Sequence, residues 1–120
     1  MPHIDDTQFG EITIDNKRYH QVLIIGKTIK ERDYKKLEEL FNTSHKIGGW
    51  EIEELLSNDP KIIIIGIGQN GAMEVDQDVI KKFQDKGIEV IVAETPQAVE
   101  IYNTRVKSEK HINALIHTTC

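Results

Sequence analysis

Apolar residues along this chain follow two spacings, one typical of strands and one typical of helices. Residues 9–14 alternate between apolar and polar, and residues 18–25 form a second β-prone stretch after turn-forming residues at 15–17. This pattern predicts a β-hairpin, with Gly26 ending its second strand and residues 27–30 continuing as a short extended piece. Later strands are expected at residues 62–67, 88–92 and 111–117.

Helical spacing occurs between these strands. An apolar stripe that includes Tyr34 and Leu37 predicts a helix over residues 31–41, and the alternating lysines and glutamates of 27–39 are expected to form its solvated face. Residues 42–49 have the composition of a loop. Further helices are expected at 50–56, 76–87 and 95–108.

Two of these helices carry recognisable ends. Asp76 is a candidate N-cap and Gly87 a candidate C-terminal stop, while Thr95 is expected to cap a helix whose first position is Pro96. Strands and helices alternate after the hairpin, so each βαβ crossover is expected to be right-handed and to cover a sheet. The fold class is therefore α/β.

Length and charge narrow the picture. The 120 residues suffice for one domain, residues 1–120, and not for two. A net charge of −5 supplies no basic field for nucleic acid, which we do not expect as a partner. The first residues resemble no secretory signal and no apolar run could cross a bilayer, so we expect a cytoplasmic protein without membrane contact.

The clearest candidate site follows the isoleucine run at 62–65. Three glycines spaced G-x-G-x-x-G end this strand, and the candidate ligand-binding residues of this loop are Gly66, Gly68, Gln69, Asn70 and Gly71. Glycines just beyond the carboxyl end of a buried strand let backbone N–H groups approach a ligand, as in open α/β sheets. We refer to residues 66–71 as the glycine loop.

A dinucleotide site at the glycine loop is disfavoured. Residues 72–75 separate the loop from the helix cap at Asp76, whereas a dinucleotide fingerprint opens its helix inside the glycines. A small anion held in a nest of loop amides fits better, and a tight turn without any ligand is the plainest interpretation. We therefore expect no cofactor.

A few polar residues could form a site rim, namely His45, Tyr102, Asn103 and His117. For Tyr102 we favour core packing with the hydroxyl at the rim, and Asn103 is expected to tie down a neighbouring segment. The pair His117 and Cys120 offers too few ligands for a metal, and we expect neither a metal site nor a catalytic Cys120. Trp50 is either a core anchor or a partner contact.

Several of these features, taken in order, resemble one small family. They are Phe9-Gly10, Gly66-x-Gly68, the segment 86–90, Thr95 with Tyr102-Asn103, and the ending His117-x-Thr119-Cys120. The resemblance is to the Mth-type domain of unknown function, whose animal members include the adipogenesis-associated Mth-domain-containing protein and a mitochondrial complex I assembly factor.

The resemblance implies a single three-layer domain with a mixed central β-sheet, flanking helices and the N-terminal hairpin. This chain departs from the family pattern at Val22, where members commonly carry aspartate, and between Gly26 and His45, where the stretch is longer than in the family and contains no tryptophan.

Two functions follow as expectations. The first is a non-catalytic binding or assembly module with a protein partner or a small anionic ligand. Such a module can also form a homo-oligomer. The alternative is a small-molecule or anion-binding enzyme that uses the glycine loop. A deep pocket lined by that loop and containing a titratable group would favour the enzyme, and a flat apolar patch would favour the module.

Overall fold

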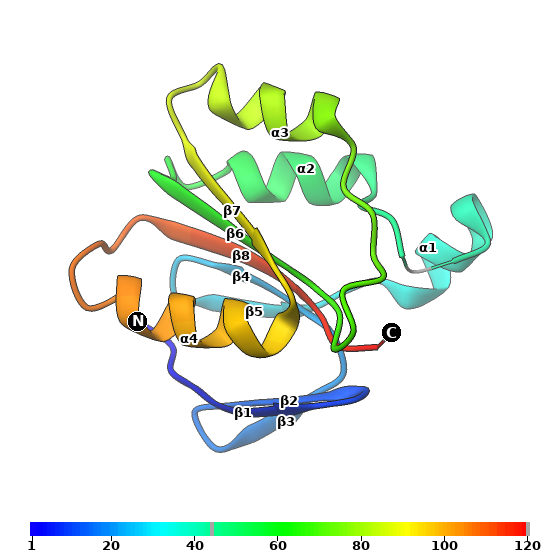
Figure 1. Ribbon diagram of the computed structural model, residues 1–120, viewed down its shortest axis with the longest axis horizontal. Helices are drawn as coiled ribbons and strands as arrows, with labels where there is room; N and C mark the ends of the chain where they lie inside the picture. The colour runs from blue at the N-terminus through cyan, green and yellow to red at the C-terminus, as the bar shows by residue number, and fades with distance from the viewer. Residues whose placement is uncertain (44, 120) are drawn as a thin grey trace.

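The fold has three layers built around a central sheet (Figure 1). The computed structural model describes residues 1–43 and 45–119, so Ser44 of the predicted loop and the terminal Cys120 lie outside the described residues. The central sheet has the order β5-β4-β8-β6-β7, formed by β4 (Val22–Ile25), β5 (Thr28–Glu31), β6 (Ile62–Ile67), β7 (Glu89–Ala93) and β8 (Ile112–His117). It is mixed, because β6 pairs in parallel with β7 and β8 while β4 pairs antiparallel with β5 and β8.

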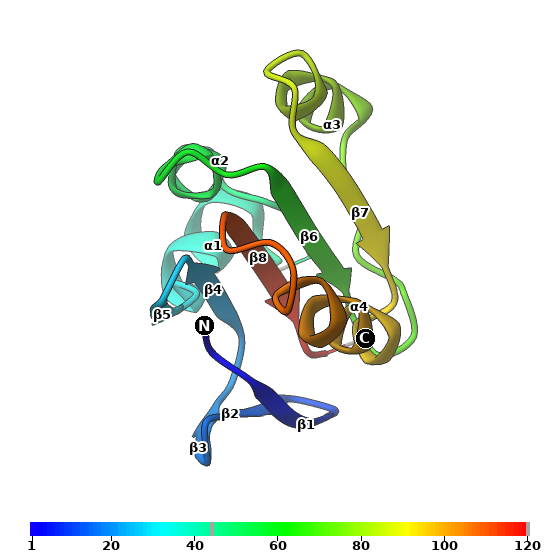
Figure 2. The ribbon, with the colours of Figure 1, turned by 90° about the vertical axis from the view of Figure 1, so that its left-hand side faces the viewer.

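The two faces of the central sheet are covered differently (Figures 1 and 2). One face packs against α4 (Thr95–Arg105) and a small antiparallel sheet of β1 (Ile4–Gln8), β2 (Glu11–Ile14) and β3 (Lys17–Tyr19). The other face is covered by α2 (Gly49–Leu56) and α3 (Gln77–Gln84). Helix α1 (Tyr34–Phe41) projects from the body of the molecule beside α2.

The isoleucine run explains the two cores. Ile62 and Ile64 belong to the apolar cluster under α4, and Ile63 and Ile65 belong to the cluster under α2 and α3. All four side chains are buried. A strand that is apolar on both faces suits an interior position in a sheet covered on both sides, and β6 has a neighbour on each side.

The predicted hairpin is wrong in its second strand. Residues 18–25 do not form one strand, because the chain leaves the small sheet after Tyr19, bends at His20 and Gln21, and enters the central sheet at Val22. The physical reason is burial. β4 is buried and pairs with strands on both sides, whereas β3 is an exposed edge of the small sheet.

Strand β1 was absent from the prediction. Its sequence contains Asp5 and Asp6, and only Ile4 is buried, so no apolar alternation marks it. The side chains of Asp15 and Asp5 instead accept hydrogen bonds from the N–H groups of His3 and Asn16. These bonds hold β1 against the turn between β2 and β3.

Most other elements are confirmed with shifted ends. The predicted extended piece at 27–30 is β5, which includes Glu31, so α1 begins only at Tyr34 after the cap Asp33. Gly87 ends the α3 segment with φ of +78°, as a C-terminal glycine should. Helix α4 ends at Arg105, three residues before the predicted end at 108.

Candidate functional site

The glycine loop lies at the carboxyl end of β6, next to the carboxyl end of β8. Gly68 and Gly71 have φ of +107° and +71°, which confirms a backbone that favours glycine there. Gly66 pairs with Ile116 of β8, and a Cβ atom on Gly66 would lie 3.0 Å from Thr95 Oγ1. The glycines therefore allow α4 to pack closely on this end of the sheet.

The amides of the loop are largely used inside the protein. The Gly68 N–H donates to Thr95 Oγ1 at 2.9 Å, and the Gly71 N–H donates to Gly68 O at 3.2 Å. The Glu94 side chain approaches Gly71 so closely that a Cβ there would lie 3.0 Å from Glu94 Cγ. An engaged pair of amides beside a carboxylate makes a poor anion cradle.

The two polar side chains of the loop differ in their surroundings. The Gln69 amide donates to Thr7 Oγ1 at 3.0 Å and so ties the loop to β1 of the small sheet. The Asn70 side chain is exposed. This geometry agrees with a tight turn that joins layers of the fold.

The prediction that Thr95 caps helix α4 is wrong. Thr95 is the first residue of α4, Glu94 occupies the N-cap position, and neither makes a side-chain capping bond. The buried Thr95 hydroxyl instead donates to His117 O while it accepts from the Gly68 N–H. The end of β8 supplies this acceptor, so the hydroxyl links three elements.

On the face of the central sheet opposite α4, four buried polar side chains form what we call the polar cluster: Gln21, Arg32, Glu51 and His117. Arg32 Nε lies 2.7 Å from Glu51 Oε2, and its Nη2 donates to Glu51 Oε1 at 2.9 Å. Both side chains are 0% exposed. Such a two-pronged pair satisfies charge and hydrogen bonding together, as a buried ion pair requires.

Arg32 also joins three segments that are distant in sequence. Its Nη1 donates to Gln21 Oε1 at 2.9 Å, and its Nη2 donates to Lys46 O at 2.8 Å. Glu51 Oε1 in turn accepts from the Gly48 N–H at 2.9 Å, which completes the N-terminus of α2. The ion pair thus fixes the chain on both sides of α1.

His117 is held uncharged within this cluster. Burial is the main cause that lowers its pKa to about 3, and electrostatic interactions with Arg32, His45 and His20 contribute to this shift. Its Nδ1 lies 2.5 Å from Gln21 Oε1, which places the proton on Nδ1, and its Nε2 then accepts from the Thr119 hydroxyl at 3.2 Å.

The arrangement of the polar cluster suits a structural role better than a role in proton transfer. The Glu51 carboxylate is neutralised by Arg32, and His117 is 0% exposed with a partner at each ring nitrogen. Gln21 Nε2 is buried and has no hydrogen-bond partner in the described part of the chain. A general acid or base must reach a substrate proton, which these positions do not permit.

The predicted rim residues fall into two separate places. His45 and His117 come together, with ring centroids 5.0 Å apart and an edge-to-face orientation. Tyr102 and Asn103 lie on the other face of the sheet, on α4. Cys120 lies outside the described residues.

Tyr102 and Asn103 hold the small sheet and the core together. Tyr102 is 0% exposed, so its hydroxyl lies in the core and not at a rim, and burial raises its pKa. That hydroxyl has no hydrogen-bond partner among the described residues. Asn103 pairs through its amide with Ile4, accepting from its N–H at 3.0 Å and donating to its carbonyl at 2.8 Å.

Gln21, Arg32 and Glu51 were missed as cluster members. Arg32 stands in the mixed-charge stretch 27–39, which was expected to be solvated, and that expectation is wrong for this residue. The predicted helix over 31–41 hid its position, because Arg32 lies between the end of β5 and the cap Asp33 of α1.

None of the helices within the described residues is both long and apolar enough to cross a membrane.

Solved structures with the same three layers are known. The chain is 28% identical to the conserved hypothetical protein PH1505 from Pyrococcus horikoshii OT3, over 98% of each chain, with a TM-score of 0.84. A structure named MT938 is 27% identical over 100% of both chains, with a TM-score of 0.80.

A more distant neighbour shares the fold and supplies a descriptive name for it. It is a Bordetella pertussis protein described as a Mth938-like domain, at 10% identity over 97% of this chain and 85% of that one, with a TM-score of 0.64. The model of the family described as "Protein of unknown function (DUF498/DUF598)" matches residues 4–117. With nearly the whole chain matched and the resemblance to the Mth-type domain confirmed, this protein belongs to the DUF498/DUF598 family.

Proposed function

We propose that this protein is a non-catalytic, cytoplasmic binding or assembly module that binds a protein partner through the surface around α1. The observation that carries the proposal is a group of exposed large apolar side chains, which we call the α1 surface: Phe9, Tyr34, Leu40 and Phe41. Phe9 and Leu40 are 67% and 61% exposed. Grouped exposed apolar residues on a folded protein are typical of interaction sites.

A bridging histidine supports treating these residues as one surface. The Nδ1 atom of the His20 ring lies 2.7 Å from the carbonyl oxygen of Gly10, the residue directly after Phe9. The same ring packs on Tyr34 with centroids 5.6 Å apart. His20 therefore joins the β1–β2 turn, which carries Phe9, to the start of α1, from which the helix leads to Leu40 and Phe41.

The polar cluster supplies the rigidity that such a surface needs. Arg32 immediately precedes the cap of α1, and its contact with Lys46 O holds the chain after the helix. Within α1 itself, all of which is described, only Leu37 is buried. The helix is thus held at both ends while most of its side chains remain available to a partner.

The alternative, an anion-binding enzyme at the glycine loop, has weaker support. Two of the loop's glycine amides already donate inside the protein, and Glu94 adds negative charge beside Gly71. The α1 surface is exposed and apolar, as the module requires. We therefore rank the binding module first.

Site-specific photo-crosslinking in the native host tests the proposal. A photoreactive amino acid at Leu40 should capture one recurrent protein, and the same amino acid at Lys81 on α3 should not. The captured protein, purified and titrated by calorimetry, should bind the unlabelled chain. Leu40→Glu should weaken that binding at least tenfold while leaving the melting temperature unchanged, since Leu40 is exposed.

Equal capture from both positions, or binding that Leu40→Glu leaves intact, would contradict the proposal. A separate thermal-shift series with inorganic phosphate tests the alternative. Stabilisation by phosphate that disappears in Gly68→Val, together with failure of the crosslinking arm, would favour the anion-binding enzyme.

A further inference from the structure

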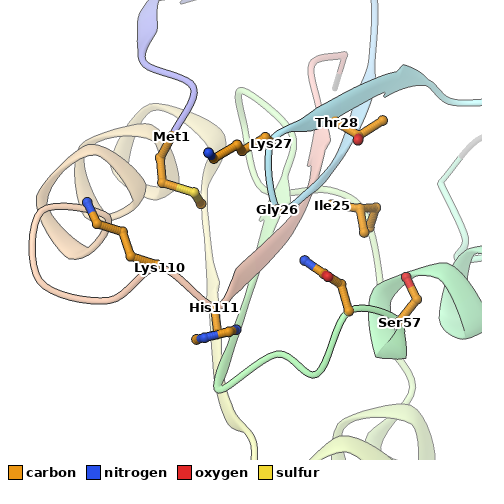
Figure 3. A pocket seen from close by; sticks show the side chains of 9 residues that line it. Met1, Ile25, Gly26, Lys27, Thr28, Ser57, Lys110 and His111 are labelled. Atoms are coloured by element: carbon orange, nitrogen blue, oxygen red, sulfur yellow. The ribbon is translucent and has the colours of Figure 1, made fainter.

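We propose that a cationic pocket at the amino ends of β6 and β8 binds a small phosphate monoester. The pocket, whose lining side chains are drawn in Figure 3, has a volume of about 870 Å³. It lies at the end of the central sheet opposite the glycine loop. Its walls come from the β4–β5 turn, the end of α2 and the segment entering β8. It is lined by Met1, Ile25, Gly26, Lys27, Thr28, Ser57, Asn58, Lys110 and His111.

The charge of this lining is opposite to that of the protein. The chain as a whole carries −5, with 20 acidic and 15 basic residues. Of the described residues that line the pocket, Lys27 and Lys110 carry formal charge on their side chains and none is Asp or Glu. The two lysines outnumber the one carboxylate that bonds to this lining within the described residues, that of Glu109, which accepts from the His111 N–H at 3.0 Å. The net positive charge of the site favours an anion.

One buried amide holds the walls together. Asn113 of β8 is 1% exposed, and its Oδ1 accepts from the Gly26 N–H at 3.0 Å. Its Nδ2 donates to Leu55 O and Ser57 O, both at 2.8 Å. A polar side chain inside a buried strand is tolerated only when satisfied, and here its three bonds join β8 to the β4–β5 turn and the end of α2.

The loops around the pocket adopt fixed and unusual backbone conformations. Gly26, Asn58 and Asp59 have φ of +59°, +64° and +51°. The positive φ of Gly26 favours glycine at this position, and a Cβ atom there would lie 2.6 Å from Asn58 Nδ2 and displace that side chain. The third wall is fixed because His111 O accepts from the Lys61 N–H at 2.8 Å. A site with preformed walls loses little entropy when a ligand binds.

The remaining groups define the ligand class. Figure 3 shows the side chains of Lys27 and Lys110 on either side of Met1. Lys110 Nζ donates one bond to Val106 O at 3.3 Å, which leaves two of its three N–H donors for a ligand. The volume exceeds that of a lone phosphate, and Ile25 and Met1 offer apolar contact. A phosphate attached to a compact apolar group fits these features.

Titration with phenyl phosphate, followed by calorimetry and by amide chemical shifts, tests this pocket. Wild type should bind phenyl phosphate more tightly than inorganic phosphate and should not bind phenol measurably. The double variant Lys27→Ala/Lys110→Ala should bind at least tenfold more weakly. The control Lys82→Ala/Lys86→Ala, which removes the same charge from exposed positions in and just after α3, should bind as wild type does.

Equal weakening in both double variants would show a general charge effect and overturn the proposal. The absence of binding to wild type at 20 mM phenyl phosphate would also overturn it, because this concentration detects dissociation constants in the roughly millimolar range. Shifts confined to the pocket residues would support it. Because the pocket is distant from the α1 surface, Leu40→Glu should leave phenyl phosphate binding unchanged. This inference is therefore tested independently of the proposed protein partner.

Discussion

A single buried histidine shows how much the fold depends on charge at the residue scale. His117 is the last residue of the central strand β8, and its ring completes a cluster that already contains the charged Arg32. A second positive charge there would be repelled by Arg32 and would lose its hydration. The folded protein therefore requires the neutral imidazole.

This requirement predicts a pH dependence of stability. The folded pKa of about 3 lies below the unfolded value of about 6.5, so only the unfolded chain takes up the proton as the pH falls between these values. The contribution of His117 is complete above pH 6.5 and decreases below it, by at most about 1.4 kcal/mol per pH unit. Urea unfolding of wild type from pH 6.5 to 5.0 should show this slope.

Two comparisons check the assignment. His117→Gln should show a flatter slope, whereas His3→Asn, which changes an exposed histidine, should keep the wild-type slope. Because His117→Gln could fold poorly, NMR of the wild-type imidazoles provides an independent measurement. A His117 resonance that titrates between pH 5 and 8 would contradict the buried neutral state.

At the scale of elements, apolar periodicity predicted β6, β7, β8 and α4 well, but it placed the central strand β4 in the hairpin. The run at 62–67, the strand at 112–117 and helix α4 are marked by their own side chains, because each buries a regular apolar pattern. Strand β1 and the break at Gln21 carry no such mark. Both depend on partners supplied by residues near the other end of the chain, namely Asn103 and His117.

The candidate site was predictable only in part for the same reason. The glycine loop is visible in sequence because glycine is rarely needed without a backbone cause. The polar cluster is not, because Gln21, Arg32, Glu51 and His117 meet only after four separate segments have folded. Spacing within one segment carries no information about such a meeting.

The dependence of α1 on the polar cluster gives a prediction for this element. Glu51→Gln removes the charge that Arg32 contacts and should lower the free energy of unfolding by about 3 kcal/mol. It should also speed hydrogen exchange in α1 more than in α4, because α1 is anchored chiefly through Arg32 and the single buried Leu37. Chemical denaturation and exchange mass spectrometry measure the two effects.

Glu53→Gln is the matched control, since Glu53 lies on the same helix and is exposed. It should change neither stability nor exchange appreciably. Uniform acceleration of exchange across all helices in Glu51→Gln would show that the ion pair stabilises the whole fold without any particular hold on α1.

At the scale of the whole molecule, the arrangement argues against dinucleotide binding. Helix α3 begins at Gln77, six residues beyond Gly71, so its N-terminal amides cannot face a phosphate held in the glycine loop. We expect NAD or NADP at 1 mM to leave the melting temperature unchanged. A ligand with a dissociation constant of about 10 μM would stabilise the fold by about 2.7 kcal/mol at that concentration, a readily measured shift. Such a shift, lost in Gly68→Val, would contradict this expectation.

The central position of β8 has a consequence for how the chain folds. β8 comes last in the sequence yet lies between β4 and β6, so β4 has no inner neighbour until residues 112–117 are present. The hydrogen bonds from the Gly10 N–H to Thr118 O and from the Ile4 N–H to Asn103 Oδ1 likewise form only when these late residues are present. The small sheet and the β4–β5 pair can form from local contacts, but the central sheet is complete only when residues 112–117 pair with both β4 and β6. This long-range pairing is expected to make folding slow.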